Sequence, residues 1–152
     1  MLCSDGSRHE LRQVEADHKL RVAGFVFSGT LLVWECPHCR LRHVDGADLE
    51  RFDAAVARAL VLSSVLTPEA LRFMREAIGA TREQLAAELE APHSTVLRWE
   101  SGRAAVPPEL IGKLARMVLA RTDRADVPRI QMRELARTNP VKVRGFKAAS
   151  GQ

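Results

Sequence analysis

LTPEALRFMREAIGATREQLAAELEAPHSTVLRWESG, residues 66–102, is the stretch that predicts the fold. Apolar residues recur in it at helical spacing, which predicts three short amphipathic helices around one small core. Thr67 before Pro68 is typical of a helix N-cap followed by proline at the first helical position. Thr81 and Gln84 have the spacing of a capping box, which predicts the start of the second helix. The predicted core residues are Leu71, Met74, Ile78, Leu85, Ala86, Leu89, Val96 and Trp99.

The third predicted helix follows a tight turn at Glu90 to Pro92. Pro92 cannot continue the preceding helix, and His93 or Ser94 can cap the next one, which Gly102 then ends. Such a turn crosses the two helices steeply and leaves the N-terminal half of the third helix exposed. A helix exposed in this way fits the major groove of DNA.

Residues 81–102 resemble the helix-turn-helix of the Xre/Cro family, a lambda-repressor-like fold. The resemblance lies in the Leu85-Ala86 pair, in the ending Arg98-Trp99-Glu100-x-Gly102, and in the spacing between them. It implies that the positions facing DNA are Arg82, His93, Ser94, Thr95 and Arg98. Pro92 and His93 stand where the family has small polar residues, which leaves the base preference open.

A plain helical bundle is the alternative interpretation of the same stretch. Arg98 carries the difference, because its guanidinium can bind guanine or two phosphate oxygens, whereas in a bundle it is only solvated. Glu100 is predicted to be a structural residue, paired with an arginine or capping a helix, because a carboxylate facing phosphate would repel it.

Cysteines mark both ends of the N-terminal segment, at Cys3 and in the run Cys36-Pro37-His38-Cys39. The residues between them, in stretches 10–17, 18–27 and 30–35, are rich in Val, Leu and Phe and are broken at Gly24 and at Ser28-Gly29. This pattern predicts two or three antiparallel strands, which would bring the two ends together. A C-P-x-C turn is typical of the knuckle of a zinc ribbon.

The second half of such a zinc site is incomplete, because Gly6 stands where a second cysteine would be. His9 is predicted to replace it, which gives the ligand set Cys3, His9, Cys36 and Cys39 for a structural zinc ion. His43 is the alternative fourth ligand. In the other interpretation the site has decayed, and the sheet folds without metal on the apolar residues Val22, Phe25, Phe27, Leu32 and Trp34.

Two further helices are predicted. Asp48 to Leu60 has an apolar stripe of Leu49, Phe52, Val56 and Leu60. The segment that starts at Val106-Pro107-Pro108 has an apolar face broader than one three-helix core can cover, which predicts a homodimer that holds two DNA-reading helices about one DNA turn apart. Alternatively, this helix simply closes the core of its own domain. Arg129 to Arg137 is expected to add one or two helical turns, and Val141 to Gln152 to be disordered.

The predicted fold class is α+β. A small antiparallel β zinc-ribbon-like domain with a connecting helix occupies residues 1–63, an all-α helix-turn-helix domain residues 64–122, and a basic, partly disordered tail residues 123–152. The formal net charge is +4, and residues 121–152 carry eight Lys and Arg against three Asp and Glu. A basic extension beside a DNA-reading module adds phosphate contacts and makes affinity fall with salt, although it can also serve solubility alone.

Several classes of protein are excluded. No apolar run approaches the roughly 20 residues of a membrane span, and the first residues lack the apolar centre of a signal peptide. The chain is therefore expected in the cytoplasm, where its three cysteines would bind metal or stay idle thiols. No Ser/His/Asp order, glycine-rich phosphate loop or apolar pair of carboxylates suggests an enzyme.

The whole order of knuckle, connecting helix and helix-turn-helix resembles the MqsA-like antitoxin family, over roughly residues 1–120. The resemblance implies a structural zinc, an N-terminal domain that binds a toxin, and a C-terminal domain that dimerises on a palindromic operator and represses its own operon. Gly6 departs from the family's second cysteine. The alternatives are a stand-alone Xre-family regulator without a toxin, and a protein-interaction adaptor that has lost DNA binding.

Overall fold

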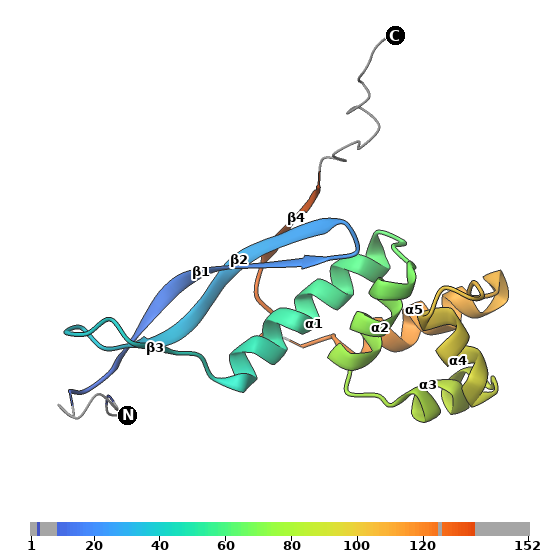
Figure 1. Cartoon of the computed structure of the whole chain (residues 1–152), viewed down its shortest axis with the longest axis horizontal. Helices are drawn as coiled ribbons and strands as arrows, with labels where there is room; N and C mark the ends of the chain where they lie inside the picture. The colour runs from blue at the N-terminus through green and yellow to red at the C-terminus, as the bar shows by residue number, and fades with distance from the viewer. Residues whose placement is uncertain (1–2, 4–8, 125, 136–152) are drawn as a thin grey trace, which may run out of the picture.

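The computed structural model describes residues 3, 9–124 and 126–135, which form an antiparallel sheet followed by a group of helices (Figure 1). This confirms the α+β class. In chain order the elements are β1 (Arg12–Val22), β2 (Phe25–Glu35), β3 (Arg42–His43), α1 (Gly46–Leu62), α2 (Pro68–Ala77), α3 (Arg82–Leu89), α4 (His93–Glu100), α5 (Pro108–Arg121) and β4 (Ile130–Glu134). None of the helices described has both the length and the apolar character needed to cross a bilayer.

β1 and β2 form one long hairpin, paired from Arg12 with Glu35 to Val22 with Phe25. The hairpin turns at Ala23 and Gly24, both at positive φ, as a tight two-residue turn requires. The predicted break at Ser28-Gly29 is wrong, since β2 runs through it.

The atoms around Gly29 leave no room for a side chain at this position. A Cβ atom there would lie 3.0 Å from the carbonyl oxygen of Arg129 and 3.2 Å from the Phe52 ring. Since β2 is continuous, its alternation buries Leu31 and exposes 44% of Leu32, which the metal-free interpretation places in the core.

β4 brings the chain back to the sheet after the helices and pairs antiparallel with β2, from Phe25 with Glu134 to Gly29 with Ile130. The helical turns predicted for residues 129–137 are therefore wrong at residues 130–134, and residues 136–137 lie outside the described part of the chain. Ile130 and Met132 are partly buried against the core while Gln131 and Arg133 are exposed, which is the period of a strand. The expectation of disorder at Val141 to Gln152 lies outside the described residues.

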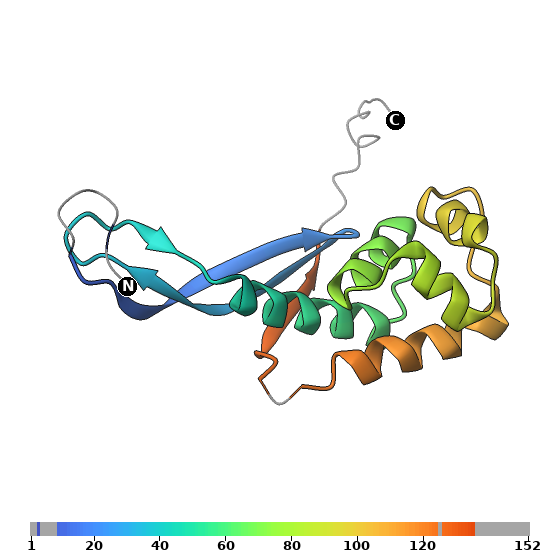
Figure 2. The same cartoon turned by 90° about the horizontal axis from the view of Figure 1, so that it is seen from below.

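α1 contacts the sheet, α2 and α5. In Figure 2 it lies between the sheet and α5. Phe52, Val56 and Leu60 are fully buried as predicted, whereas Leu49 is 37% exposed, so the apolar stripe starts later than expected. One hydrophobic cluster extends from Val22 in the hairpin to residues of α5, and so crosses the predicted boundary between residues 63 and 64. The division into domains at residues 1–63, 64–122 and 123–152 stays a prediction.

The helix starts follow local signals. The Thr67 hydroxyl accepts a hydrogen bond from the Ala70 N–H, and Thr81 and Gln84 form the predicted capping box. For α4 the prediction of a capping His93 or Ser94 is wrong. Pro92 holds the N-cap position and no side chain caps the helix.

α5 has the predicted helical form, with Leu114 and Val118 buried. Its other apolar residues that pack partly buried on the core of the same chain are Leu110, Ile111, Ala115, Met117 and Leu119. α1 contacts α5 as well. Arg58 of α1 donates a hydrogen bond to the carbonyl oxygen of Leu119 at 3.2 Å. Much of the apolar excess that predicted a homodimer is therefore covered within the chain, and the homodimer itself stays a proposal.

Candidate DNA-binding surface and metal centre

α3 and α4 are joined by a turn as short as predicted. α3 ends at Leu89, Glu90 adopts the left-handed conformation with φ 56°, and α4 begins at His93. The Ala91 N–H donates to the carbonyl oxygen of Ala86 at 2.9 Å, which closes the turn. Val96 and Trp99 bury one side of α4 in the core, so the opposite side is left to solvent.

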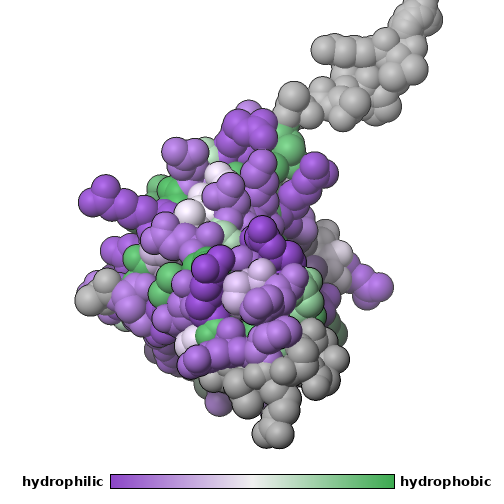
Figure 3. Space-filling model, turned by 90° about the vertical axis from the view of Figure 1, so that its left-hand side faces the viewer, coloured by the Kyte–Doolittle hydropathy of each residue, from purple (hydrophilic) through white to green (hydrophobic). Residues whose placement is uncertain are grey.

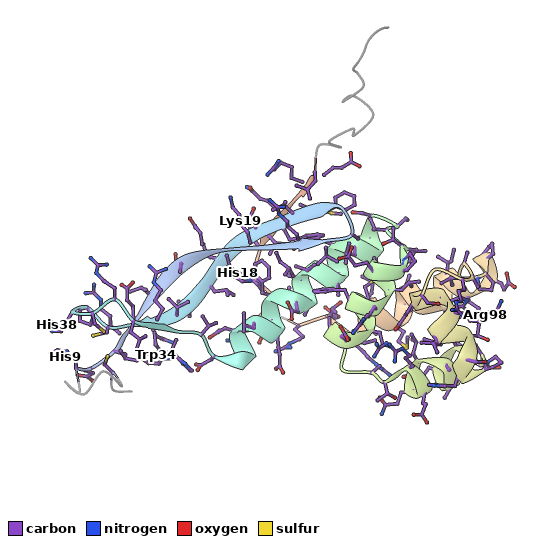
Figure 4. The ribbon with its side chains drawn as sticks, viewed as in Figure 1. His9, His18, Lys19, Trp34, His38 and Arg98 are labelled. Carbon is purple, nitrogen blue, oxygen red and sulfur yellow. The ribbon has the colours of Figure 1, made fainter. Side chains whose placement is uncertain are left out.

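The residues predicted to face DNA gather on and beside this free side of α4. His93, Ser94 and Arg98 are exposed, and Thr95 is partly buried. Because neither His93 nor Ser94 caps the helix, both side chains remain available to a ligand. The Arg98 guanidinium forms no hydrogen bond or ion pair with any residue that the structure describes, and it lies at the end of the molecule far from His9 and His38 (Figure 4).

A buried ion-pair network fixes α4 on its neighbours. The Glu100 side chain is only 4% exposed and accepts hydrogen bonds from Arg75 Nε at 2.5 Å and from Arg82 Nε at 2.9 Å. Arg75 also donates to the Ala80 carbonyl oxygen at 2.9 Å. The predicted arginine pairing of Glu100 is thus confirmed.

Arg82 therefore has a structural partner that the sequence did not assign to it. Only its Nε atom is used by Glu100, and its terminal amino groups have no hydrogen-bond partner among the residues described. With 36% of its side chain exposed, Arg82 can hold Glu100 and still offer these amino groups to a phosphate. Arg75 is not among the residues predicted from the sequence. Its only signal there is an arginine at a core-facing position of α2, and its side chain is 9% exposed.

At the other end of the hairpin, three thiols come together. The Sγ atoms of Cys3, Cys36 and Cys39 all lie within 4.8 Å of one another, and those of Cys3 and Cys39 are 3.4 Å apart. Three sulfurs bound to one tetrahedral zinc ion are separated by about 3.8 Å, given a Zn–S distance near 2.3 Å. The donor set therefore fits zinc in both chemistry and size.

The knuckle is preorganised by its own backbone. The Arg40 N–H donates to the Cys36 carbonyl oxygen at 2.9 Å, and Arg40 takes a positive φ of 64° that completes the turn. The backbone N–H groups of Cys39 and His38 also point at the Cys36 sulfur, which lowers the pKa of that thiol and favours the thiolate that a metal binds.

The fourth predicted ligand is placed differently from the three thiols. The His9 ring stacks on the His38 ring with centroids 3.9 Å apart, at the same end of the molecule (Figure 4). His43, the alternative ligand, directs Nε2 toward a carboxylate oxygen of Asp45 at 3.4 Å. Within the described part of the chain, the compact group of metal-ligating atoms contains the thiols alone.

The loop between β2 and β3, which carries Cys36 and Cys39, lies at the opposite end of the long axis from α4 (Figures 1 and 2). The hairpin tip touches the helices where the Ala23 N–H donates to Glu69 Oε1 at 2.8 Å, at the start of α2. Viewed from the knuckle end, the described surface is mostly hydrophilic with small, separate apolar areas (Figure 3). The two candidate sites are thus joined through the packed core but share no surface.

Residues 69–129, from α2 to the segment before β4, match the family model of a helix-turn-helix domain. No curated protein sequence matches the chain significantly. The matched region contains α3, the turn and α4, and it supports the predicted helix-turn-helix of Xre type.

Proposed function

We propose that this protein is a sequence-specific, DNA-binding transcriptional regulator whose helix α4 enters the major groove. The observation that carries the proposal is the exposed side of α4, where Ser94 and the unpaired Arg98 stand on a helix anchored by Val96 and Trp99. An arginine in this setting suits the O6 and N7 acceptors of guanine, since its guanidinium donates two parallel hydrogen bonds.

The neighbouring residues suit the DNA backbone. Arg82 offers its free amino groups to a phosphate, while His93 and Thr95 stand in the first turn of α4, close to where the helix meets the groove edge. The excess of positive charge in residues 121–152 adds contacts that do not depend on sequence. We propose that two copies bind a palindromic operator as a homodimer.

Within this function, the protein serves in our proposal as the cytoplasmic antitoxin of a type II toxin–antitoxin pair and represses its own operon. The order of hairpin, knuckle, α1 and helix-turn-helix supports this role. A toxin would bind the N-terminal part, which lies at the far end of the molecule from α4, so that toxin and DNA can be bound together (Figure 1). In this proposal the protein is a regulator and not an enzyme.

We further propose that zinc is a structural cofactor of the N-terminal part. Cys3, Cys36 and Cys39 would hold it, with His9 as fourth ligand. The ion would clamp the start of the chain to the knuckle, which lies at the end of the sheet where the separate small cluster of Cys3, Leu11 and Cys36 supplies little apolar burial.

A gel-shift experiment with the upstream region of the protein's own gene tests the DNA-binding function. The full chain should shift this fragment at low concentration and an unrelated fragment of equal length only at much higher concentration. If both shift alike, the protein binds DNA without sequence preference and is not a sequence-specific regulator. If neither shifts, the adaptor interpretation holds. Co-purification with the product of the adjacent gene tests the antitoxin role, and a regulator that works without that product is the stand-alone alternative.

A further inference from the structure

An apolar side chain stands on the same side of α4 as the polar residues assigned to DNA. Leu97 is 47% exposed. It lies one helical turn after Ser94 and directly before Arg98, so the three side chains share one continuous surface. The other large hydrophobic residues that the structure shows exposed are Leu32, Leu41, Leu49 and Leu62, all of which belong to the sheet, the knuckle or α1.

The surroundings of Leu97 do not suit a protein partner. Surfaces that bind proteins through apolar contact are contiguous patches of several residues. Leu97 instead lies between the exposed residues Ser94 and Arg98, in a helix whose remaining apolar anchors, Val96 and Trp99, are already buried. A single apolar group set among hydrogen-bonding groups suits a ligand with the same mixture.

The major groove presents such a mixture. Each base pair offers hydrogen-bond donors and acceptors at its edge, and pairs that contain thymine add an apolar C5 methyl group. A leucine side chain cannot form a hydrogen bond with a donor or acceptor of a base. It can pack on a methyl group, and this contact removes the leucine side chain and the methyl group from water. A cytosine at the same position has no methyl group, so the apolar contact with the leucine would be lost.

We propose that Leu97 is a specificity-determining residue that recognises the methyl group of one thymine in each half-site, beside the base that Arg98 reads. This inference rests on the proposed DNA-binding function. It divides the free side of α4 into a hydrogen-bonding part at Ser94 and Arg98 and an apolar part at Leu97.

The test replaces thymine by deoxyuridine, which removes the methyl group and keeps every hydrogen-bonding atom of the base. The full chain first selects duplexes from a randomised DNA library, and each thymine of the selected site is then replaced in turn. For the parent protein, one replacement per half-site should weaken binding roughly four-fold, the effect of losing one buried methyl-sized group. For Leu97→Ala the same replacement should have no effect, while circular dichroism shows an unchanged fold.

Leu62→Ala is the matched control, because Leu62 is 63% exposed on α1 and should leave the response to deoxyuridine unchanged. Equal responses of the parent and Leu97→Ala at every thymine would overturn the inference alone, as would a selected site without thymine. Failure of the folded parent to enrich any sequence would overturn the proposed function and this inference with it.

Discussion

The Nε atom of Arg75 lies 2.5 Å from Oε2 of Glu100, and this contact joins α2 to α4 through the interior of the helical group. Both side chains are nearly buried, at 9% and 4% exposure. A buried ion pair of this kind contributes little net stability, but the loss of one partner leaves the other charged and without compensation. The pair therefore fixes the angle at which α4 presents its free side.

Replacement of Glu100 by alanine is expected to destabilise the protein by about 3 kcal/mol, because Arg75 is left buried without a counter-charge. Urea unfolding followed by circular dichroism measures the change. Glu88→Ala is the control, since Glu88 pairs with Arg121 at the surface and its loss should cost less than about 1 kcal/mol. Equal losses in the two variants would show that the buried network does not hold α4.

Arg98→Ala is expected to reduce the free energy of specific operator binding by about 1–3 kcal/mol. The fold should be unchanged, because the Arg98 side chain has no partner among the described residues. Titration of operator and of random DNA in the same salt measures the change. Operator affinity equal to that of the parent would show that α4 does not read bases through this residue.

Arg82→Ala is expected to weaken binding to operator and to random DNA alike, because its free amino groups face a phosphate in our proposal. The slope of log affinity against log salt should fall by about 1, the value for one lost phosphate contact. The variant should also unfold at lower urea concentration than Arg98→Ala does, since it alone removes a partner of Glu100. A loss confined to the operator would contradict the phosphate contact.

Protein purified without added metal is expected to contain stoichiometric zinc, measured by atomic emission. Cys36→Ser and His9→Ala should lose it, while His43→Ala should retain it because His43 faces Asp45 instead. Loss of zinc in His43→Ala together with its retention in His9→Ala would show that the fourth ligand is misassigned. A parent protein without zinc would show a decayed site.

Glu35 is expected to make folding sensitive to acid. The hydrogen bond from Arg42, at 2.8 Å, lowers the pKa of this carboxyl below its ordinary value of 4.5, and Arg40 and Arg12 lower it further. A carboxyl with a lower pKa in the folded state stabilises the protein above the unfolded-state pKa, and this contribution disappears as the pH falls through the folded-state pKa.

The experiment compares the urea midpoints of the parent protein and Glu35→Gln in the presence of a chelator, from neutral pH down through the lowered pKa of Glu35. The parent should be the more stable at neutral pH. The difference should shrink as the pH falls below 4.5 and vanish once the pH lies below the lowered pKa of Glu35. A difference that is constant with pH would show that the Arg42 contact does not depend on the charge of Glu35.

The parts of the fold that could be predicted depend on neighbours in the sequence. Thr67 and Thr81 cap their helices because each bonds to a backbone N–H three residues later, and a spacing of three is visible in the sequence. The positions of Val96 and Trp99 follow in the same way from the period of a helix.

The parts that could not be predicted depend on contacts distant in the sequence. Gly29 indicated a turn, but its small size serves the approach of Phe52 and Arg129, and no local pattern reveals that. The partners Arg75 and Glu100 are likewise separated by 25 positions. For the metal site, residue types identified the thiols, whereas the stacking of His9 on His38 depends on how the two ends of the hairpin meet.

The pairing of Gly29 with Ile130 closes a chain loop of about 100 residues. The entropy lost in that closure must be offset before any contact of β4 contributes stability. We therefore expect β4 to join the sheet late in folding, after the helices have shortened the effective distance. During synthesis the edge of β2 at residues 25–29 stays open until residues 130–134 have emerged. In that interval its backbone groups can pair with another chain, and a chaperone that binds extended strands would have its clearest substrate there.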